Sequence, residues 1–218
     1  MKRPAVLALL HTSPVHVPVF DALRDAHHPG LVLRHHVDEG LLARARDEGT
    51  DAVADAVGAA VLRAVDAGAG AVLCTCSTIG GLAERTPAGV PVLRVDRPMA
   101  AEAAAHRRVT VVAALAGTVG PTRDLVLDEA ARRGSAPQLR TLLVDGAWER
   151  FEAGDRDGYL DAVAAAVDGV RDADVIVLAQ ASMADAAART RTTVPVLSSP
   201  RPGLAAAAAS VPGTAGPA

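Results

Sequence analysis

The stretch "AVLCTCSTIGG", residues 71–81, has the pattern of a strand, a turn and the start of a helix. Four apolar residues are followed by small polar residues and then by two glycines. A short, continuous apolar run is typical of a strand that is buried on both faces of a parallel sheet. Both cysteines of the chain, Cys74 and Cys76, lie in this stretch. The turn after the strand is therefore a candidate functional site.

Seven further apolar runs have the same character, and helical patterns lie between them. One pattern has a Thr50/Asp51 cap and a glycine stop at Gly68, and another has Pro121 near its start and Gly134 past its end. Buried strands that alternate with helices indicate an α/β fold with mainly parallel sheets. The eight expected strands are residues 5–10, 31–37, 70–75, 90–95, 109–114, 139–144, 174–179 and 194–197; the three clearest helical patterns are residues 50–70, 121–134 and 157–174.

Composition limits the classes of function. The chain has 218 residues, 50% of them hydrophobic and 22% charged, and a net charge of -3. This balance argues against a nucleic-acid surface, which needs clustered Lys and Arg. No apolar run approaches the roughly 20 residues that span a bilayer. The start "MKRPAVLALLHTSP" resembles a signal peptide, but its apolar run is short and no A-x-A-like site follows. We expect a cytoplasmic protein with free cysteines and a disordered tail over residues 210–218.

The sequence repeats itself at an offset of 104 residues. "VPVL" occurs at residues 90–93 and again at 194–197, and "PVLRVDRP" matches "PVLSSPRP". At the same offset, "AVLCTCSTIG" matches "VIVLAQASMA" and "LALLHTS" matches "VVAALAG". These matches predict two pseudo-symmetric lobes, each a mainly parallel sheet flanked by helices. The first lobe is expected at residues 1–95 plus 205–218, and the second at residues 96–204.

Ligands of such sheets bind outside the carboxyl ends of the strands, so we expect the active site in a cleft between the lobes. At the 104-residue offset, Cys76 is matched by Gln180. A thiol at a helix N-terminus is favoured as the thiolate and is suited to moving a proton. The alternative is that Cys76 is a small buried apolar residue. Cys74, two residues earlier, is expected inside the strand.

Other polar residues are candidates for binding a carboxylate. They follow expected strands or match such positions in the other lobe: Thr12, Ser13, Ser77, Thr78, Thr118, Gln180 and Ser182. His11 is a candidate second acid or base, although turn chemistry also explains "HTSP" at residues 11–14. The pairs His27-His28 and His35-His36 are expected on the solvated surface, and no metal site is expected. The absence of a G-x-G-x-x-G or P-loop pattern argues against a nucleotide cofactor.

"TCSTIGG", "VIVLAQASMAD", "RVDRPMAAEA" (residues 94–103) and "AALAGTVGPT" (residues 113–122) together resemble the aspartate/glutamate/hydantoin racemase superfamily. The resemblance implies two pseudo-symmetric α/β lobes, no cofactor and a cysteine after a strand in each lobe. Cys76 matches the first cysteine, whereas Gln180 stands where the second belongs.

The resemblance implies an isomerase of racemase type that acts, through Cys76, at the carbon alpha to a carboxylate of a small acidic substrate. Because inversion needs an acid or base on both faces of the carbon, the missing second cysteine leaves two alternatives open. One is a single-cysteine decarboxylase or cis–trans isomerase of a small dicarboxylate, and the other is a non-catalytic carboxylate-binding protein. A homodimer is expected by analogy only, and no nucleic-acid or membrane partner is expected.

Overall fold

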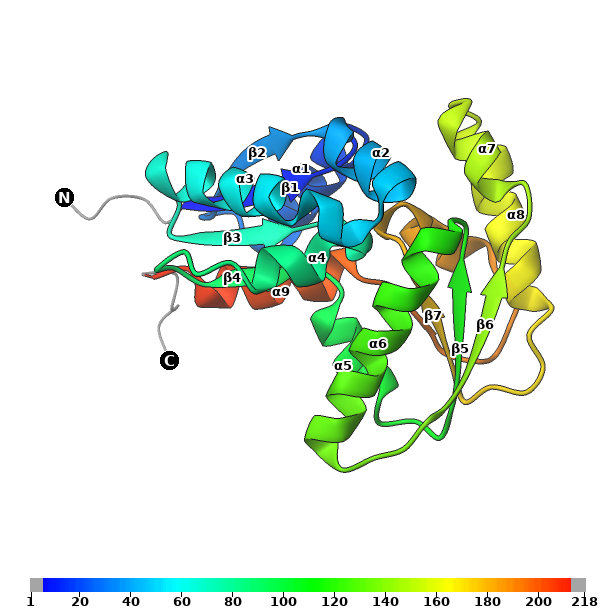
Figure 1. Ribbon diagram of the computed structural model, residues 1–218. Coiled ribbons are helices and arrows are strands. Elements are labelled where there is room, and N and C mark those ends of the chain that lie inside the picture. The colour runs from blue at the N-terminus through cyan, green and yellow to red at the C-terminus, as the bar shows by residue number, and fades with distance from the viewer. Residues whose placement is uncertain (1–5, 213–218) are drawn as a thin grey trace. The chain divides into compact units, whose positions relative to one another are not determined.

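The computed structural model describes residues 6–212, which divide into two compact α/β units. The first unit runs to Val95 and resumes at Pro200, and the second unit is Asp96–Ser199 (Figure 1). Each unit holds one four-stranded sheet in which every pair of neighbouring strands is parallel. The predicted fold class, two similar lobes with parallel sheets flanked by helices, is confirmed.

The sheet of the first unit has the strand order β2-β1-β3-β4. The central strands β1 and β3 are buried along almost their whole length, as their continuous apolar sequences predict. The elements of this unit are β1 (Val6–His11), α1 (His16–His27), β2 (Val32–Val37), α2 (Glu39–Glu48), η1 (Thr50–Val53), α3 (Ala54–Asp66), β3 (Ala71–Cys74), α4 (Ser77–Glu84), β4 (Val92–Arg94) and α9 (Pro200–Ser210).

The sheet of the second unit has the order β6-β5-β7-β8, which is the same topology. Apolar clusters cover both of its faces, and the aromatic residues Trp148, Phe151 and Tyr159 gather on one of them. The elements of this unit are α5 (Arg97–Ala103), β5 (Arg108–Ala113), α6 (Ala116–Arg133), β6 (Gln138–Leu143), α7 (Ala147–Glu152), α8 (Arg156–Asp168), β7 (Val175–Leu178), η2 (Ala181–Arg189) and β8 (Val196–Leu197).

Backbone register refines the internal repeat. Thr75 N–H donates to the Leu10 carbonyl, and in the second unit Ala179 N–H donates to the Val112 carbonyl. The third strands therefore correspond at the predicted offset of 104, whereas the first strands correspond at 102. The expected match of "LALLHTS" with "VVAALAG" is wrong by two residues, because the connection between β1 and β3 is two residues shorter than the connection between β5 and β7. His11 corresponds to Ala113.

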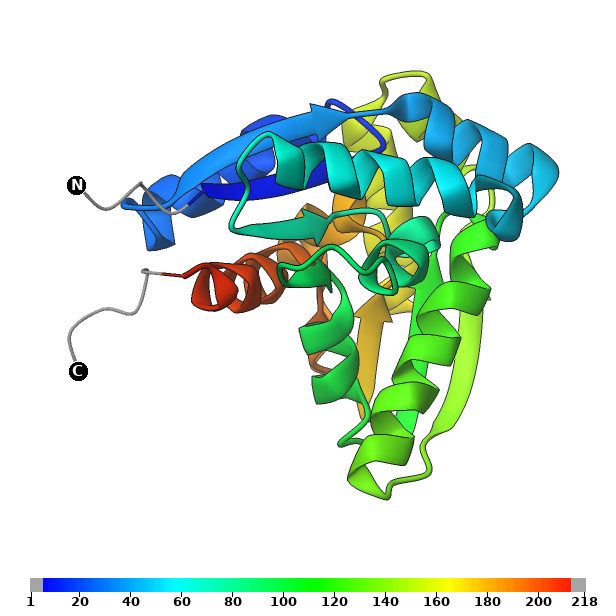
Figure 2. The ribbon, with the colours of Figure 1, turned by 60° about the vertical axis from the view of Figure 1, so that its left-hand side comes forward.

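Helix α9 belongs wholly to the first unit, although residues 200–204 were expected in the second lobe. Leu204 lies in the apolar cluster on one face of the first sheet, and α9 lies beside β3 and α1 (Figure 2). Gly203 makes this close packing feasible, since a Cβ there would meet the Val95 carbonyl oxygen and would lie 2.6 Å from Val95 Cγ2. One continuous helix cannot be divided between two cores, so the unit boundary coincides with its first residue.

Helix α6 begins five residues before Pro121, so the prediction that this proline marks a helix start is wrong. The proline lies inside the helix, where it removes one backbone donor. Gly117 and Gly120, which disfavour helix in a sequence, lie in the same N-terminal part. The predicted end is confirmed, because Gly134 caps the helix in the left-handed conformation with φ 71°. The expected strand residue Ala5 and the tail beyond residue 212 lie outside the described residues.

Candidate functional site

Cys76 lies at the carboxyl end of β3 and is the N-cap residue of α4, which starts at Ser77. Its backbone is extended, with φ -104° and ψ 116°, so the chain leaves the strand and turns directly into the helix. The first N–H groups of a helix point outward without intrahelical partners and carry partial positive charge. Cys76 therefore lies beside a group of donors that favours an anion.

The two cysteines differ in accessibility. Cys74 is fully buried inside the strand, and its Sγ lies 3.7 Å from the Cys76 carbonyl oxygen. Cys76 packs against the same apolar cluster but keeps a 9% exposed fraction. Side chains two residues apart on a strand share a face, so Cys74 packs beneath Cys76. Access of a reagent or substrate therefore favours Cys76.

Arg94 is a further charged residue near this turn, and sequence analysis did not single it out. It pairs with Cys74 across β3 and β4, and its side chain is 7% exposed. Arg94 Nη2 donates to the carbonyl of Ser77 at 3.4 Å, in the first turn of α4. A Cβ on Gly80 would lie 3.0 Å from Arg94 Cβ, which explains why glycine stands there. An arginine directly after "VPVL" gives no sequence signal that separates it from a surface cation.

Hydroxyl groups surround the strand ends of the first unit. Thr12 is 6% exposed and follows β1 directly, and Ser13 comes next. No hydrogen bond involves the side chain of either residue within residues 6–212. Ser77 and Thr78 are the first two residues of α4, are buried, and both have polar partners. Thr12 and Ser13 are thus the hydroxyls most available to a ligand.

His11 is fully buried, and both of its ring nitrogens have partners. Nδ1 lies 2.8 Å from Thr75 Oγ1, and Nε2 lies 2.8 Å from His35 Nδ1. Burial, together with the nearby His16, His35 and His36, lowers the pKa of His11 to about 3. This geometry does not support the expected role of His11 as an acid or base that touches the substrate, because neither nitrogen is free to reach it.

His35 also departs from expectation, since it does not lie on the solvated surface. Its side chain is 16% exposed and points under α1, where Nε2 lies 3.3 Å from Asp21 Oδ1. His36 is half-buried, and its Nε2 has no hydrogen-bond partner within residues 6–212. Successive side chains of a strand point to opposite faces of the sheet, so the imidazoles of His35 and His36 lie on opposite faces. The sequence pattern did not reveal that one of these faces is covered by α1.

Gln180 is the N-cap residue of η2 at the carboxyl end of β7, so its position in the second unit is that of Cys76 in the first. Its Oε1 accepts from the N–H of Ala114 at 2.7 Å and from the N–H of Leu115 at 3.4 Å. Within the described part of the chain, no hydrogen bond uses its Nε2 amide group. The oxygen therefore holds the backbone that follows β5, and the Nε2 N–H groups remain available to donate to a ligand.

Thr118 and Ser182 were expected among the binding residues and lie elsewhere in the second unit. Thr118 is in the first turn of α6, 1% exposed, and its N–H donates to the Leu115 carbonyl. Ser182 Oγ is 2.8 Å from the hydroxyl of Tyr159, a residue whose pKa is raised by burial. Ser182 is therefore tied to the apolar core beneath η2. The structure brings Cys76, Ser77 and Thr78 together with Thr12 and Ser13, and Gln180 beside the end of β5.

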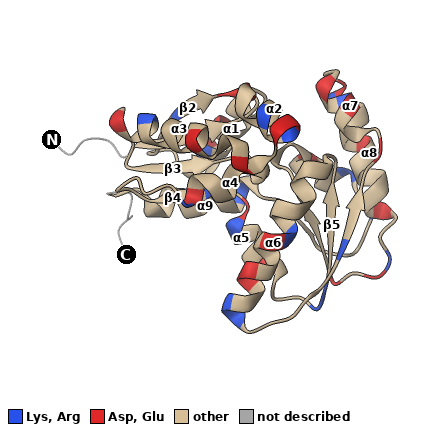
Figure 3. Cartoon of the chain, viewed as in Figure 1, with Lys and Arg blue, Asp and Glu red and all other residues tan. Residues whose placement is uncertain are grey.

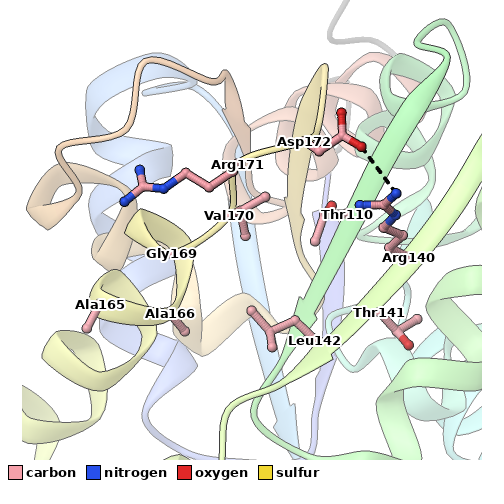
Figure 4. Close-up of a pocket in the computed structure, with 10 residues that line it drawn as sticks. All are labelled: Thr110, Arg140, Thr141, Leu142, Ala165, Ala166, Gly169, Val170, Arg171 and Asp172. Carbon is pink, nitrogen blue, oxygen red and sulfur yellow. Dashed lines mark ion pairs between the residues drawn. The ribbon is translucent and has the colours of Figure 1, made fainter.

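The second unit also has a hollow of about 430 Å³, between the middle of β5 and β6 and the C-terminal end of α8 (Figure 4). Leu142, Val170 and the alanines of α8 form its apolar part, and an Arg140–Asp172 ion pair of 3.2 Å lies at its edge. It lies away from the carboxyl ends of the strands, and no cysteine or histidine lines it. Within residues 6–212, no cluster of His, Cys, Asp or Glu suited to a metal ion occurs.

Charged residues of both signs lie on the outer helices rather than in one patch, as α6 shows (Figure 3). On α6, Arg132 pairs with Asp128 and Glu129, and Arg97 of α5 reaches the same two carboxylates. Across residues 6–212, no helix has the length and apolar character needed to cross a membrane.

Solved structures with the same fold include three enzymes. Picrophilus torridus aspartate racemase matches with 14% identity and a TM-score of 0.70, covering 94% of this chain and 92% of that chain. A glutamate racemase from Bacillus anthracis matches with 14% identity and a TM-score of 0.69, covering 95% of this chain and 82% of that chain. Arylmalonate decarboxylase matches with 21% identity and a TM-score of 0.59, covering 98% and 94%.

No curated protein sequence matches the chain. The family model described as Asp/Glu/Hydantoin racemase matches residues 15–209, a range that includes both β3–α4 with Cys76 and β7–η2 with Gln180. The chain belongs to the Asp/Glu/hydantoin racemase family.

Proposed function

We propose that this protein is an enzyme that transfers a proton, without a cofactor, at the carbon alpha to a carboxylate of a small acidic substrate. Cys76 is the acid or base, and the single observation that carries the proposal is its position as N-cap of α4 at the end of a buried strand. The helix N-terminus favours both a thiolate and a bound carboxylate there. Family membership supports this assignment.

Gln180 favours a reaction on one face of the substrate carbon over racemisation. An amide side chain does not exchange protons near neutral pH, and its oxygen is held by two backbone N–H groups. A one-sided reaction is decarboxylation followed by protonation, or cis–trans isomerisation through a thioether formed by Cys76. The fold is shared with an arylmalonate decarboxylase as well as with racemases, so decarboxylation is compatible with it. Racemisation is the second candidate, and a non-catalytic carboxylate-binding protein is the third.

In the proposed complex, the substrate carboxylate accepts hydrogen bonds from N–H groups of the first turn of α4 and from nearby hydroxyls. Thr12 and Ser13 are the first candidates, because their hydroxyls have no hydrogen bond to other described residues. Ser77 and Thr78 present the helix N–H groups. In the second unit, the Nε2 amide of Gln180 is the group that is available to a ligand.

The test is a turnover screen with four substrate classes: amino acids such as aspartate and glutamate, hydantoins, substituted malonates and maleate. The native protein should act on one class, and Cys76→Ser should lose at least about 10²-fold of that activity, the typical contribution of a positioned acid or base. Cys74→Ala is the matched control and should retain it, because Cys74 is fully buried. Binding without turnover in all four classes would leave the carboxylate-binding protein as the correct account.

Two substitutions at Gln180 separate its roles. Gln180→Glu keeps an oxygen for the N–H groups of Ala114 and Leu115 but replaces the amide donor by a carboxylate oxygen. The fold should persist while affinity for an anionic substrate falls. Gln180→Cys supplies a second thiol and should raise racemisation at least about tenfold. Fast racemisation by the native protein would refute the one-sided reaction and require another second acid.

A further inference from the structure

A row of four polar side chains crosses one face of the first sheet near the carboxyl ends of its strands. His35 of β2, His11 of β1 and Thr75, directly after β3, occupy neighbouring strands, and Asp21 of α1 continues the row to the surface. The distances along it are 2.8 Å from Thr75 Oγ1 to His11 Nδ1, 2.8 Å from His11 Nε2 to His35 Nδ1 and 3.3 Å from His35 Nε2 to Asp21 Oδ1.

The surroundings of the row are apolar except at its outer end. Phe20 lies over the His11 ring with centroids 5.7 Å apart, and the His11 and His35 rings stack at 5.1 Å. His11 is fully buried and Thr75 is 2% exposed, whereas the side chain of Asp21 is 39% exposed. The Asp21 end is therefore the end of the row that is nearest to solvent.

With both imidazoles neutral, only one direction of donation makes all three bonds. The Asp21 carboxylate accepts, so His35 Nε2 carries its proton and His35 Nδ1 must accept. His11 Nε2–H then donates to His35, and His11 Nδ1 accepts from the Thr75 hydroxyl. A hydroxyl has one proton to donate, so the Thr75 Oγ1 contact of 3.2 Å with the Leu10 carbonyl is then not a donation.

One added proton on His35 reverses the direction. Both nitrogens of His35 then donate, Nε2 to Asp21 and Nδ1 to His11 Nε2. The proton of His11 must move to Nδ1, which donates to Thr75 Oγ1, and the Thr75 hydroxyl turns to the Leu10 carbonyl at 3.2 Å. That carbonyl also accepts from Thr75 N–H at 3.0 Å, so it has a partner in both states. Each state satisfies every polar atom of the row.

We propose that Asp21, His35, His11 and Thr75 form a two-state, proton-sensitive hydrogen-bond chain that couples the protonation of His35 to the tautomer of His11 and to the Thr75 hydroxyl beside Cys76. Thr75 is the residue between Cys74 and Cys76, so its hydroxyl direction changes the local dipoles at the start of α4. His11 and His35 are positioning residues in this account, and the effect on Cys76 rests on the proposed function.

The charged and titratable groups around the row agree with His35 as the proton acceptor. The ring centroid of His16, on α1, lies 6.2 Å from that of His11, and His36 follows His35 on β2. Arg24 shares Asp21 Oδ1 at 3.2 Å and also contacts Asp25, while α9, which packs on α1, carries only the exposed Arg201. Of the two imidazoles in the row, only His35 contacts a carboxylate, so the geometry places an added proton there rather than on His11, whose pKa is lowered to about 3 by burial and by these imidazoles.

The direct test is the tautomeric state of the imidazoles, read from ¹⁵N chemical shifts and long-range ¹H–¹⁵N couplings of the native protein at pH 8 and pH 5.5. His11 should carry its proton on Nε2 at pH 8 and on Nδ1 once His35 is protonated. In His35→Gln or Asp21→Asn the His11 tautomer should no longer change with pH. A His11 ring that keeps one tautomer in the native protein over this range overturns the proposal, whatever the function of Cys76.

The coupling to the site is tested by the rate of Cys76 alkylation with iodoacetamide across the same pH range, measured by peptide mapping. The native protein should show a step of at least about twofold that coincides with the change in the His11 tautomer, because networks of this kind modulate coupled sites by such amounts. His35→Gln should remove the step and leave Cys76 reactive. A step that survives His35→Gln refutes the coupling. An unreactive Cys76 with a switching His11 would instead refute the proposed function and leave the chain of hydrogen bonds intact.

Discussion

Acidification from pH 7.5 to pH 5.5 should destabilise the protein through two buried histidines. Burial lowers the pKa of His16 to about 4 and is the largest cause of the lowering of the His11 pKa to about 3. In the unfolded chain both imidazoles titrate near their ordinary pKa of about 6.5. The unfolded state therefore binds more protons below that pH, and stability is complete above it and declines as the pH falls toward the folded-state pKa values.

The magnitude follows from the difference in bound protons. Over this range each unfolded imidazole gains about 1.4 kcal/mol of protonation free energy that the folded one does not, so the pair predicts a loss of roughly 3 kcal/mol in the free energy of unfolding. The result is insensitive to the folded pKa values, provided that they stay well below 5.5. His36, whose pKa burial also lowers, adds to the loss in the same direction.

Urea unfolding at the two pH values measures the loss. His16→Gln should remove about 1.4 kcal/mol of it, whereas His27→Gln, which replaces an exposed imidazole on the same helix, should not. A native protein that loses less than about 1 kcal/mol, or a His16→Gln variant with the native pH dependence, would show that these side chains are not buried as neutral imidazoles.

Two further comparisons test the packing of the units. Gly203→Ala should destabilise the protein by about 2 kcal/mol or more, because its Cβ would meet Val95. Gly117→Ala, in open space near the start of α6, should instead stabilise it by about 0.5 kcal/mol, and equal effects in urea unfolding would contradict the α9 packing. Arg97→Met leaves the buried Glu129 without its nearest cation and should lower the free energy of unfolding by about 2 kcal/mol or more. Arg150→Met removes an exposed ion pair with Asp155 and should lower it by less than about 1 kcal/mol. Similar losses for the two variants at pH 7.5 would contradict the buried pair.

Much of the fold could be predicted because its signals are local. The central strands are apolar runs, and each of the eight strands falls within two residues of its expected bounds where the structure describes it. The edge strands β2 and β6 contain polar residues as well. Helix α6 was misjudged because Gly117, Gly120 and Pro121 disfavour helix locally, while packing of the helix against the second sheet prevails. The boundary between the units was misplaced by five residues. An alanine-rich segment after a proline does not indicate which of two apolar cores it packs against.

The site was predictable where a residue follows a strand and unpredictable where its role depends on neighbours from other strands. The position of Cys76 at the end of a strand was predicted from its own segment. The roles of His35 and Arg94 depend on burial under helices and on register between strands, neither of which a single sequence contains. His11 was singled out from "HTSP", but its role changed because register places Thr75 and His35 on its two ring nitrogens.

The central claim is that Cys76 delivers a proton to one face of a carbon next to a carboxylate. Turnover in D₂O with a substituted malonate or another substrate found in the screen, followed by chiral analysis of the product, tests it most directly. The account predicts a single deuterium in a product of one handedness from the native protein and from Cys74→Ala, and no enzymatic product from Cys76→Ser. A racemic product from the native protein, or full activity of Cys76→Ser, would contradict it.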